Sequence, residues 1–194
     1  LYAAINYLLS LSPKNILTVE DPIEYEISGV AQAEVDSSDK VNFTKALKSL
    51  LRHDPDVVMI GEIRDSASLD AAVKASLTGH LVLSTLHSGS AKGALTRLVD
   101  MGLDAPLATS TLNMAVAQRL VRRLCPVCGG KKRSCEGASV CHECAGRGYK
   151  GRVGLFELYS PALGIGTSMA DDAREKIASG VTSELEVARV MGED

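Results

Sequence analysis

The sequence predicts an α/β fold with a parallel sheet, and two observations lead to this prediction. Three short apolar runs rich in β-branched residues, at residues 15–20, 56–62 and 80–87, are each bounded by Pro, Gly, Asp or Ser turn signals. Helical patterns of apolar residues separate these runs. Because a strand that follows a helix in this way returns by a right-handed crossover, the three strands are expected to run parallel in one sheet.

The segment between the first two strands is predicted to hold a β excursion and then a helix. Residues 24–35 alternate enough in polarity for a β segment. Asn42 is a suitable cap for the helix that follows, in which apolar side chains recur at helical spacing, and Asp54-Pro55 ends it.

Further helices are predicted after the second and third strands. Asp65 or Ser66 caps a helix that runs through Leu77 and ends at a glycine. Beyond the third strand, helical patterns extend over residues 90–101 and 105–124. The predicted core therefore reaches the first cysteines of the chain.

Composition divides the chain into three expected parts. Residues 1–124 form the core, residues 125–152 are rich in Cys, Gly and Arg and form a small module, and residues 153–194 hold a final strand and a helical tail. No uncharged apolar run approaches the roughly 20 residues of a membrane-spanning helix, and no signal peptide is present. We therefore expect a cytoplasmic protein.

The charge is nearly balanced overall but uneven along the chain. With 24 acidic and 21 basic residues the net charge is -3, so bulk electrostatics indicates no nucleic-acid or membrane partner. Basic side chains gather around the cysteines, at Arg119, Arg122, Arg123, Lys131, Lys132, Arg133, Arg147, Lys150 and Arg152.

Polar residues stand at the carboxyl ends of all three predicted strands, where open α/β sheets bind ligands. These are Glu20-Asp21, Glu62 and His87. For phosphoryl chemistry, Glu62 fits the acid that holds a metal or its water shell, and Glu20 or Asp21 fits the group that orients the attacking water. His87 fits a phosphate sensor.

Two neighbouring residues have competing interpretations. His80 lies at the entry of the third strand and His87 at its exit, so one strand length should separate them. His80 is therefore either a functional residue or a helix-to-strand junction residue held by the backbone. Arg64, just past Glu62, either pairs with an acid or reaches a phosphate.

At these positions the sequence resembles the secretion ATPase superfamily. The segments "ILTVEDPIEY", "LLRHDPDVVMIGEIRD" and "TGHLVLSTLHS" resemble its Asp box, Walker B segment and His box. The segments "AQRLVRRLCPVC" and "CHECAGRGYKGRVGLFELY" resemble the tetracysteine module of its assembly-type members, the type II secretion and type IV pilus extension ATPases. The resemblance covers residues 1–159 and implies a RecA-like P-loop NTPase core.

The resemblance also implies what precedes Leu1. In this family a glycine-rich phosphate loop, G-x-x-x-x-G-K-[ST], leads into a helix whose start resembles "LYAAINYLL", so we expect a fragment cut just after that loop. Without the loop the chain should neither bind ATP tightly nor hydrolyse it. The family roles fall on Glu20 and Asp21 in the Asp box, on Glu62 in the Walker B segment, and on His80 and His87 in the His box as catalytic residues. The residues expected to contact the nucleotide are Glu62, Arg64 and His87.

The intact protein, by the same resemblance, is a hexameric motor that uses ATP and Mg²⁺. Its partners are expected to be an inner-membrane platform and cytoplasmic-domain proteins of a secretion or pilus machine, so that it is peripheral to the membrane. Type II secretion and pilus extension remain alternatives at this point, and no nucleic acid is expected.

The five cysteines of the chain are a second feature of the sequence, and four of them indicate a metal site. Cys125-x2-Cys128 and Cys141-x2-Cys144 have the spacing of zinc ligands, and a cytosolic setting disfavours the alternative of disulfides. The twelve residues between the pairs are fewer than is usual in the resembling family. Cys135 lies within that linker as a spare thiol or a substitute ligand.

Two functions from other classes compete with the ATPase. The segments "CHECAGRG" and "CPVCGGKK" resemble the zinc domain of J-type chaperones, which would make the chain a peptide-binding module, although that domain repeats its motif four times. A nucleic-acid motor is the other alternative, with the basic cysteine region as its contact. The chain has two Phe, five Tyr and no Trp, which leaves little for base stacking.

Overall fold

The structure is a computed structural model that describes residues 1–35, 40–133 and 139–192, with the backbone alone at residues 40–44. Helix α2 (Lys40–Leu50) already includes Asn42, so Asn42 does not cap this helix as predicted. The predicted roles of Cys135 lie outside the described residues. Contacts divide the chain into two compact units. Unit 1 comprises Leu1–Ser88 with Gly93–Thr111, and unit 2 comprises Gly89–Lys92 with Leu112–Asp194.

Unit 1 is built on a four-stranded parallel sheet in the order β2-β1-β3-β4. Its strands are β1 (Ile16–Glu20), β2 (Val30–Glu34), β3 (Val57–Glu62) and β4 (Leu81–Thr85). The central strands β1 and β3 are buried almost throughout, which explains their continuous apolar runs. The three predicted strands and their parallel arrangement are confirmed, and the predicted β excursion forms the edge strand β2.

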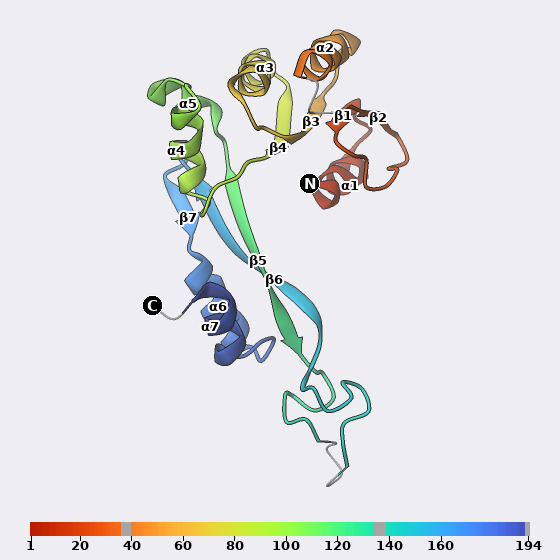
Figure 1. Cartoon of the computed structure of the whole chain (residues 1–194), viewed down its shortest axis with the longest axis vertical. Helices are drawn as coiled ribbons and strands as arrows, with labels where there is room; N and C mark the ends of the chain where they lie inside the picture. Colours follow the sequence, from red (N-terminus) through yellow and green to blue (C-terminus); the bar gives the residue numbers. More distant parts are fainter. Residues whose placement is uncertain (36–39, 134–138, 193–194) are drawn as a thin grey trace. The chain divides into compact units, whose positions relative to one another are not determined.

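Helices cover both faces of this sheet (Figure 1). On one face α1 (Tyr2–Leu11) buries Ile5 against Ile16, Val57 and Met59. Burial of these large aliphatic side chains contributes on the order of 2 kcal/mol each. This packing places the first turn of α1 beside the carboxyl end of β1.

On the other face α2 and α3 contact the strands that flank β3. α2 (Lys40–Leu50), continued by the short 3-10 helix η1 (Leu51–His53), contacts β1, and α3 (Ser66–Leu77) contacts β4. Asp65 caps α3 as predicted, because its carboxylate accepts a 2.9 Å hydrogen bond from the Ser68 amide. Two further helices, α4 (Gly93–Asp100) and α5 (Ala105–Thr111), complete unit 1.

The single helix predicted for residues 105–124 is wrong in its second half. α5 ends at Thr111, and β5 (Ala115–Leu124) follows as a strand. β5 pairs antiparallel with β6 (Tyr149–Ser160) along most of its length, and this pairing overrides the local helical spacing. The predicted boundary after residue 124 therefore does not coincide with the division between the units.

Unit 2 is a three-stranded antiparallel sheet with two helices and a long loop. β7 (Ile165–Thr167) pairs with β6. β6 is the strand predicted from "VGLFELYSP". The loop between β5 and β6 carries the cysteines, and Figure 1 shows it at the tip of the β5-β6 hairpin. The tail forms α6 (Met169–Ala178) and α7 (Glu184–Met191), and Ala173 of α6 packs against the sheet.

A buried carboxylate attaches α7 to β5. Glu186 is inaccessible to solvent and accepts hydrogen bonds from the Arg122 amide at 2.9 Å and from the Arg122 guanidinium at 2.6 and 2.8 Å. Arg189 donates two more, at 2.7 and 2.9 Å. These two guanidinium groups, that of Arg189 first, hold the pKa of Glu186 far below its ordinary value of 4.5 despite burial.

We therefore expect Glu186→Gln to lower the free energy of unfolding by about 2 kcal/mol, since charged hydrogen bonds are lost and both arginines are half exposed to water. A depressed folded-state pKa contributes stability above the unfolded-state pKa, and this contribution is lost as the pH falls through the folded-state value. Acidification below about pH 4.5 should thus destabilise the parent chain more than Glu186→Gln. Urea titrations at several pH values measure this. A matching loss with the exposed Glu184→Gln would contradict the specific role of Glu186.

Candidate functional site

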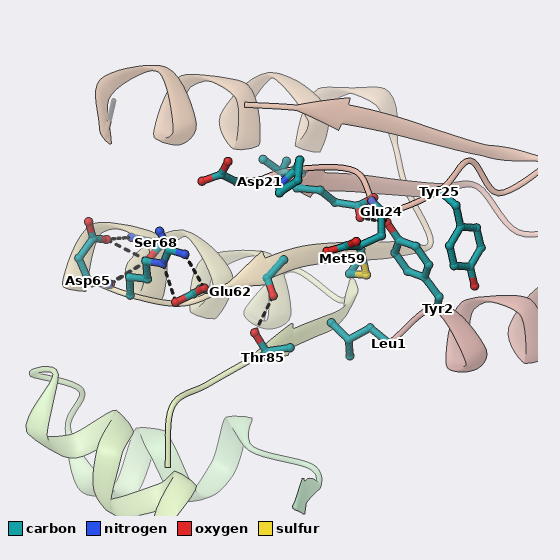
Figure 2. A pocket seen from close by; sticks show the side chains of 15 residues that line it. Leu1, Tyr2, Asp21, Glu24, Tyr25, Met59, Glu62, Asp65, Ser68 and Thr85 are labelled. Atoms are coloured by element: carbon teal, nitrogen blue, oxygen red, sulfur yellow. Dashed lines mark hydrogen bonds and ion pairs between the residues drawn. The ribbon is translucent and has the colours of Figure 1, made fainter. Parts of the chain in front are cut away.

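A cleft of about 430 Å³ opens at the carboxyl ends of β1 and β3 in unit 1 (Figure 2). Its polar lining includes four of the residues singled out from the sequence, namely Glu20, Asp21, Glu62 and Arg64. Its apolar lining comes from Leu1, Tyr2, Tyr25 and Met59, among others. The parallel sheet thus brings together strand ends that lie about 40 residues apart in the sequence.

Glu62, at the end of β3, lies against two basic side chains. Arg64 approaches both of its oxygens, with Nη2 2.8 Å from Oε2 and Nε 2.6 Å from Oε1, and His87 Nε2 lies 3.2 Å from Oε1. The hydrogen bond from Arg64 is the main cause that keeps the pKa of Glu62 below its ordinary value, against the opposing effect of burial. Glu62 is therefore ionised at neutral pH.

The Oε1 atom of Glu62 lacks an aligned hydrogen bond in the part of the chain that the structure describes. It is buried, and Arg64 Nε and His87 Nε2 approach it at 2.6 and 3.2 Å. A carboxylate oxygen of this kind suits Mg²⁺ or a water molecule of its coordination shell. The residues present at the end of β3 therefore fit a magnesium-bound nucleotide.

Glu20 is held differently, by neutral donors from three elements. It is buried, and Oε1 accepts hydrogen bonds from Thr18 Oγ1 at 2.6 Å and from Gln32 Nε2 at 2.9 Å. Oε2 accepts a hydrogen bond from the Tyr2 hydroxyl. Asp21, the other candidate at this strand end, is exposed. The two neighbouring carboxylates therefore differ in burial.

The three hydrogen-bond donors to Glu20 were not predicted from the sequence. Thr18 lies two residues before Glu20, on the same face of β1, and this period of two could have indicated it. Gln32 is the residue of β2 that pairs with Thr18, which depends on the strand register. Tyr2 carries no sequence signal, because its contact depends on how α1 packs.

His80 and His87 lie at opposite ends of β4, as predicted. His80 precedes the strand, and its Nδ1 lies 3.0 Å from the Ala75 carbonyl oxygen and 2.9 Å from Thr78 Oγ1, at the end of α3. His87 follows the strand and contacts Glu62. The structure therefore brings His87 to Glu62, outside the lining of the cleft, and leaves His80 at a helix-to-strand junction.

The four paired cysteines form a compact buried cluster in unit 2. Their sulfur atoms all lie within 4.8 Å of one another, and no disulfide joins them. Cys125 Sγ lies 3.9 Å from Cys141 Sγ, and Cys128 Sγ lies 3.7 Å from Cys144 Sγ. Four sulfurs at about 2.3 Å from a tetrahedral zinc ion are about 3.8 Å apart, so the cluster fits zinc.

The loops that carry the two cysteine pairs meet at glycines. Gly148 has a φ of +82°, and a Cβ there would lie 2.9 Å from the Gly130 carbonyl oxygen. Its amide also donates to Cys144 Sγ at 3.2 Å. A glycine is therefore required at this position both for its backbone conformation and for the close approach of the two loops.

Comparison with known proteins extends over both units. The family model described as type II/IV secretion system protein matches residues 1–191. The chain belongs to this family. The resemblance deduced from the Asp box, Walker B, His box and tetracysteine segments is thereby confirmed, and the family accounts for both units where the J-type chaperone alternative left the parallel sheet unexplained.

Individual members of the type II/IV secretion family match all or nearly all of the chain. It is 43% identical to type II secretion system protein E of Pseudomonas aeruginosa, with 100% of this chain and 46% of that protein aligned. It is 39% identical to the type IV pilus assembly ATPase PilB of Myxococcus xanthus, with 94% and 37% aligned. The chain thus spans less than half the length of these relatives.

The fold of this family member is also that of solved structures. The crystal structure of the pilus retraction motor PilT with bound ADP matches it with a TM-score of 0.63 and 28% identity, over 92% of this chain and 47% of that one. This likeness confirms the predicted α/β fold of the ATPase class. Among the described helices, none combines the length and the apolar character needed to cross a bilayer.

Proposed function

We propose that the protein containing this chain is an ATP-hydrolysing motor subunit of type II protein secretion or type IV pilus assembly. The cleft carries the proposal, because it joins an ionised Glu62 to the anchored Glu20 at the carboxyl ends of two parallel strands. The names of the relatives support secretion and pilus assembly alike. Assembly as a cytoplasmic homo-hexamer on an inner-membrane platform belongs to the same proposal.

Each residue at the cleft is proposed to have a separate role in ATP hydrolysis. Glu62 would hold Mg²⁺ or a water of its shell, and that ion would supply charge neutralisation on the phosphates. Arg64 and His87, which flank Glu62, would contact the nucleotide phosphates. Glu20 is favoured over Asp21 as the group that orients the attacking water, since three donors fix its direction.

The chain by itself is proposed to be inactive. Its 194 residues contain no G-x-x-x-x-G-K-[ST] loop, and the backbone amides and lysine of such a loop supply the positive cradle for the β- and γ-phosphates. The test is ATP turnover by the full-length protein and by this chain alone. The proposal is supported if the full-length protein hydrolyses ATP and this chain does not. It is refuted if the full-length protein is inactive in the presence of Mg²⁺.

The cysteine cluster is proposed to be a structural zinc site. Four protein sulfurs complete a tetrahedral shell, which leaves no open position for a substrate or an activated water. Because the cluster closes the loop between β5 and β6, zinc would hold this loop rather than take part in hydrolysis.

The two histidines of the His box should respond differently to substitution. His87→Ala in the full-length protein should lower kcat for ATP about tenfold or more, since it removes a contact of Glu62, with little change in melting temperature because the side chain is 88% exposed. His80→Ala should lower the melting temperature, since it removes the contacts at the end of α3. Steady-state kinetics and thermal unfolding measure the two effects, with the exposed His53→Ala as control. If His87→Ala only destabilises the protein, His87 has no functional role.

A further inference from the structure

The hydrogen bonds of Glu20 point to a role for Tyr2, the first residue of α1. Tyr2 and Glu20 are 18 residues apart, and the packing of α1 on the sheet brings them together in the cleft. Figure 2 shows Tyr2 with the other residues that line the cleft. The Tyr2 hydroxyl donates to Glu20 Oε2 and accepts a 3.1 Å hydrogen bond from the Glu24 amide. It therefore links α1, the end of β1 and the turn that follows β1.

The ring of Tyr2 is itself fixed. The ring of Tyr25 meets it edge-on, with centroids 4.5 Å apart and an interplanar angle of 89°. Burial, followed by the hydrogen bond to Glu20, raises the pKa of Tyr2 above 10.0, so the phenol stays protonated and remains a donor throughout the physiological range. Tyr2 is thus a permanent donor in a fixed place.

Among the residues that the structure describes, the donors to Glu20 leave it one open acceptor position. An ionised carboxylate has about four such positions, two on each oxygen. Thr18 and Gln32 take the two on Oε1, and Tyr2 takes one on Oε2. The position that remains is on Oε2, the oxygen held by Tyr2, in a residue that lines the cleft. The hydrogen bond from the Tyr2 hydroxyl therefore sets the direction in which the open acceptor position of Glu20 Oε2 points.

We infer that Tyr2 is a positioning residue that aims the free acceptor position of Glu20 at the attacking water. This inference rests on the proposed function of the cleft and assigns a role to a residue outside the Asp box, Walker B and His box segments. In addition to packing on the sheet, α1 then orients the Glu20 carboxylate at the end of β1, because Tyr2 lies in the first turn of this helix.

The contact itself is tested in this chain without any hydrolysis. Tyrosine labelled with ¹³C at Cζ reports ionisation of each phenol by NMR, and Tyr2→Phe identifies the Tyr2 signal. In Glu20→Gln the pKa of Tyr2 should fall toward its ordinary value, because the anionic acceptor is lost. The exposed Glu26→Gln should leave it unchanged. An unaltered Tyr2 titration in Glu20→Gln would show that the two side chains do not interact.

The positioning role is tested by kinetics in the full-length protein. Tyr2→Phe should lower kcat for ATP about tenfold and change KM less than about twofold, since it leaves the nucleotide contacts in place. Tyr7→Phe makes the same change on the same helix at a 64% exposed position and should match the parent protein. In the double variant Tyr2→Phe/Glu20→Gln, kcat should be no lower than in Glu20→Gln alone, because Tyr2 acts through Glu20.

The outcomes separate this inference from the proposed function. A parent protein that hydrolyses ATP, combined with a Tyr2→Phe variant equal to Tyr7→Phe, overturns the inference alone. Effects that multiply in the double variant also overturn it, because they indicate a general structural role. A parent protein that does not hydrolyse ATP overturns the proposed function and this inference with it.

Discussion

Replacement of Glu62 by Gln in the full-length protein should suppress ATP turnover by on the order of 100-fold or more while nucleotide binding is retained. Gln has nearly the same shape as Glu and keeps an oxygen for Arg64, but it removes the negative charge that would hold Mg²⁺ or its water shell. The phosphates would be cradled elsewhere, by the glycine-rich loop, so affinity should change little.

The measurement combines steady-state turnover with equilibrium binding of a fluorescent ATP analogue. Glu26→Gln, on an exposed carboxylate outside the cleft, is the matched control and should behave as the parent protein. Unchanged turnover in Glu62→Gln would remove Glu62 from the mechanism. Loss of binding together with turnover would assign it to nucleotide affinity instead.

Loss of one cysteine of the cluster should remove the metal and unfold the loop between β5 and β6. We expect the chain to bind close to one zinc ion, and Cys141→Ser to bind much less than the parent chain. Structural zinc contributes roughly 10–16 kcal/mol in small zinc-binding peptides, far more than this loop would gain from its own apolar contacts. Metal analysis by mass spectrometry and limited proteolysis of the loop measure both effects.

Cys135→Ser is the matched control for this experiment. If Cys135 is a spare thiol, the variant keeps its zinc and its resistance to protease, whereas loss of zinc would make it a substitute ligand. A parent chain that contains no metal and joins the four buried cysteines in disulfides would contradict the zinc site. The sulfur positions argue against that outcome, since all four converge on one centre.

The sequence was sufficient for those elements that local pattern determines. β1 and β3 are continuous apolar runs because these central parallel strands are buried on both faces, and α3 begins with a capping residue that the structure confirms. β4 is also an apolar run, at the edge of the sheet, where its residues are exposed or half-buried. The meeting of Glu20 and Glu62 followed from one general property of parallel sheets, the alignment of their carboxyl ends.

Features that depend on long-range packing were not predictable in this way. Residues 115–124 have apolar spacing compatible with a helix, and their pairing with β6 depends on a strand about 35 residues further along the chain. The Arg122-Glu186 contact bridges 64 residues, and the Tyr2-Glu20 contact depends on how α1 lies on the sheet. No local periodicity encodes such contacts.

The most direct test of the ATPase assignment is the coding sequence immediately upstream of Leu1. The ATPase assignment predicts a G-x-x-x-x-G-K-[ST] loop that ends within a few codons of Leu1, so that α1 continues directly from the phosphate loop. A start codon in that place, with no such loop before Leu1, would contradict the assignment. The chain would then be a docking subunit that does not hydrolyse ATP.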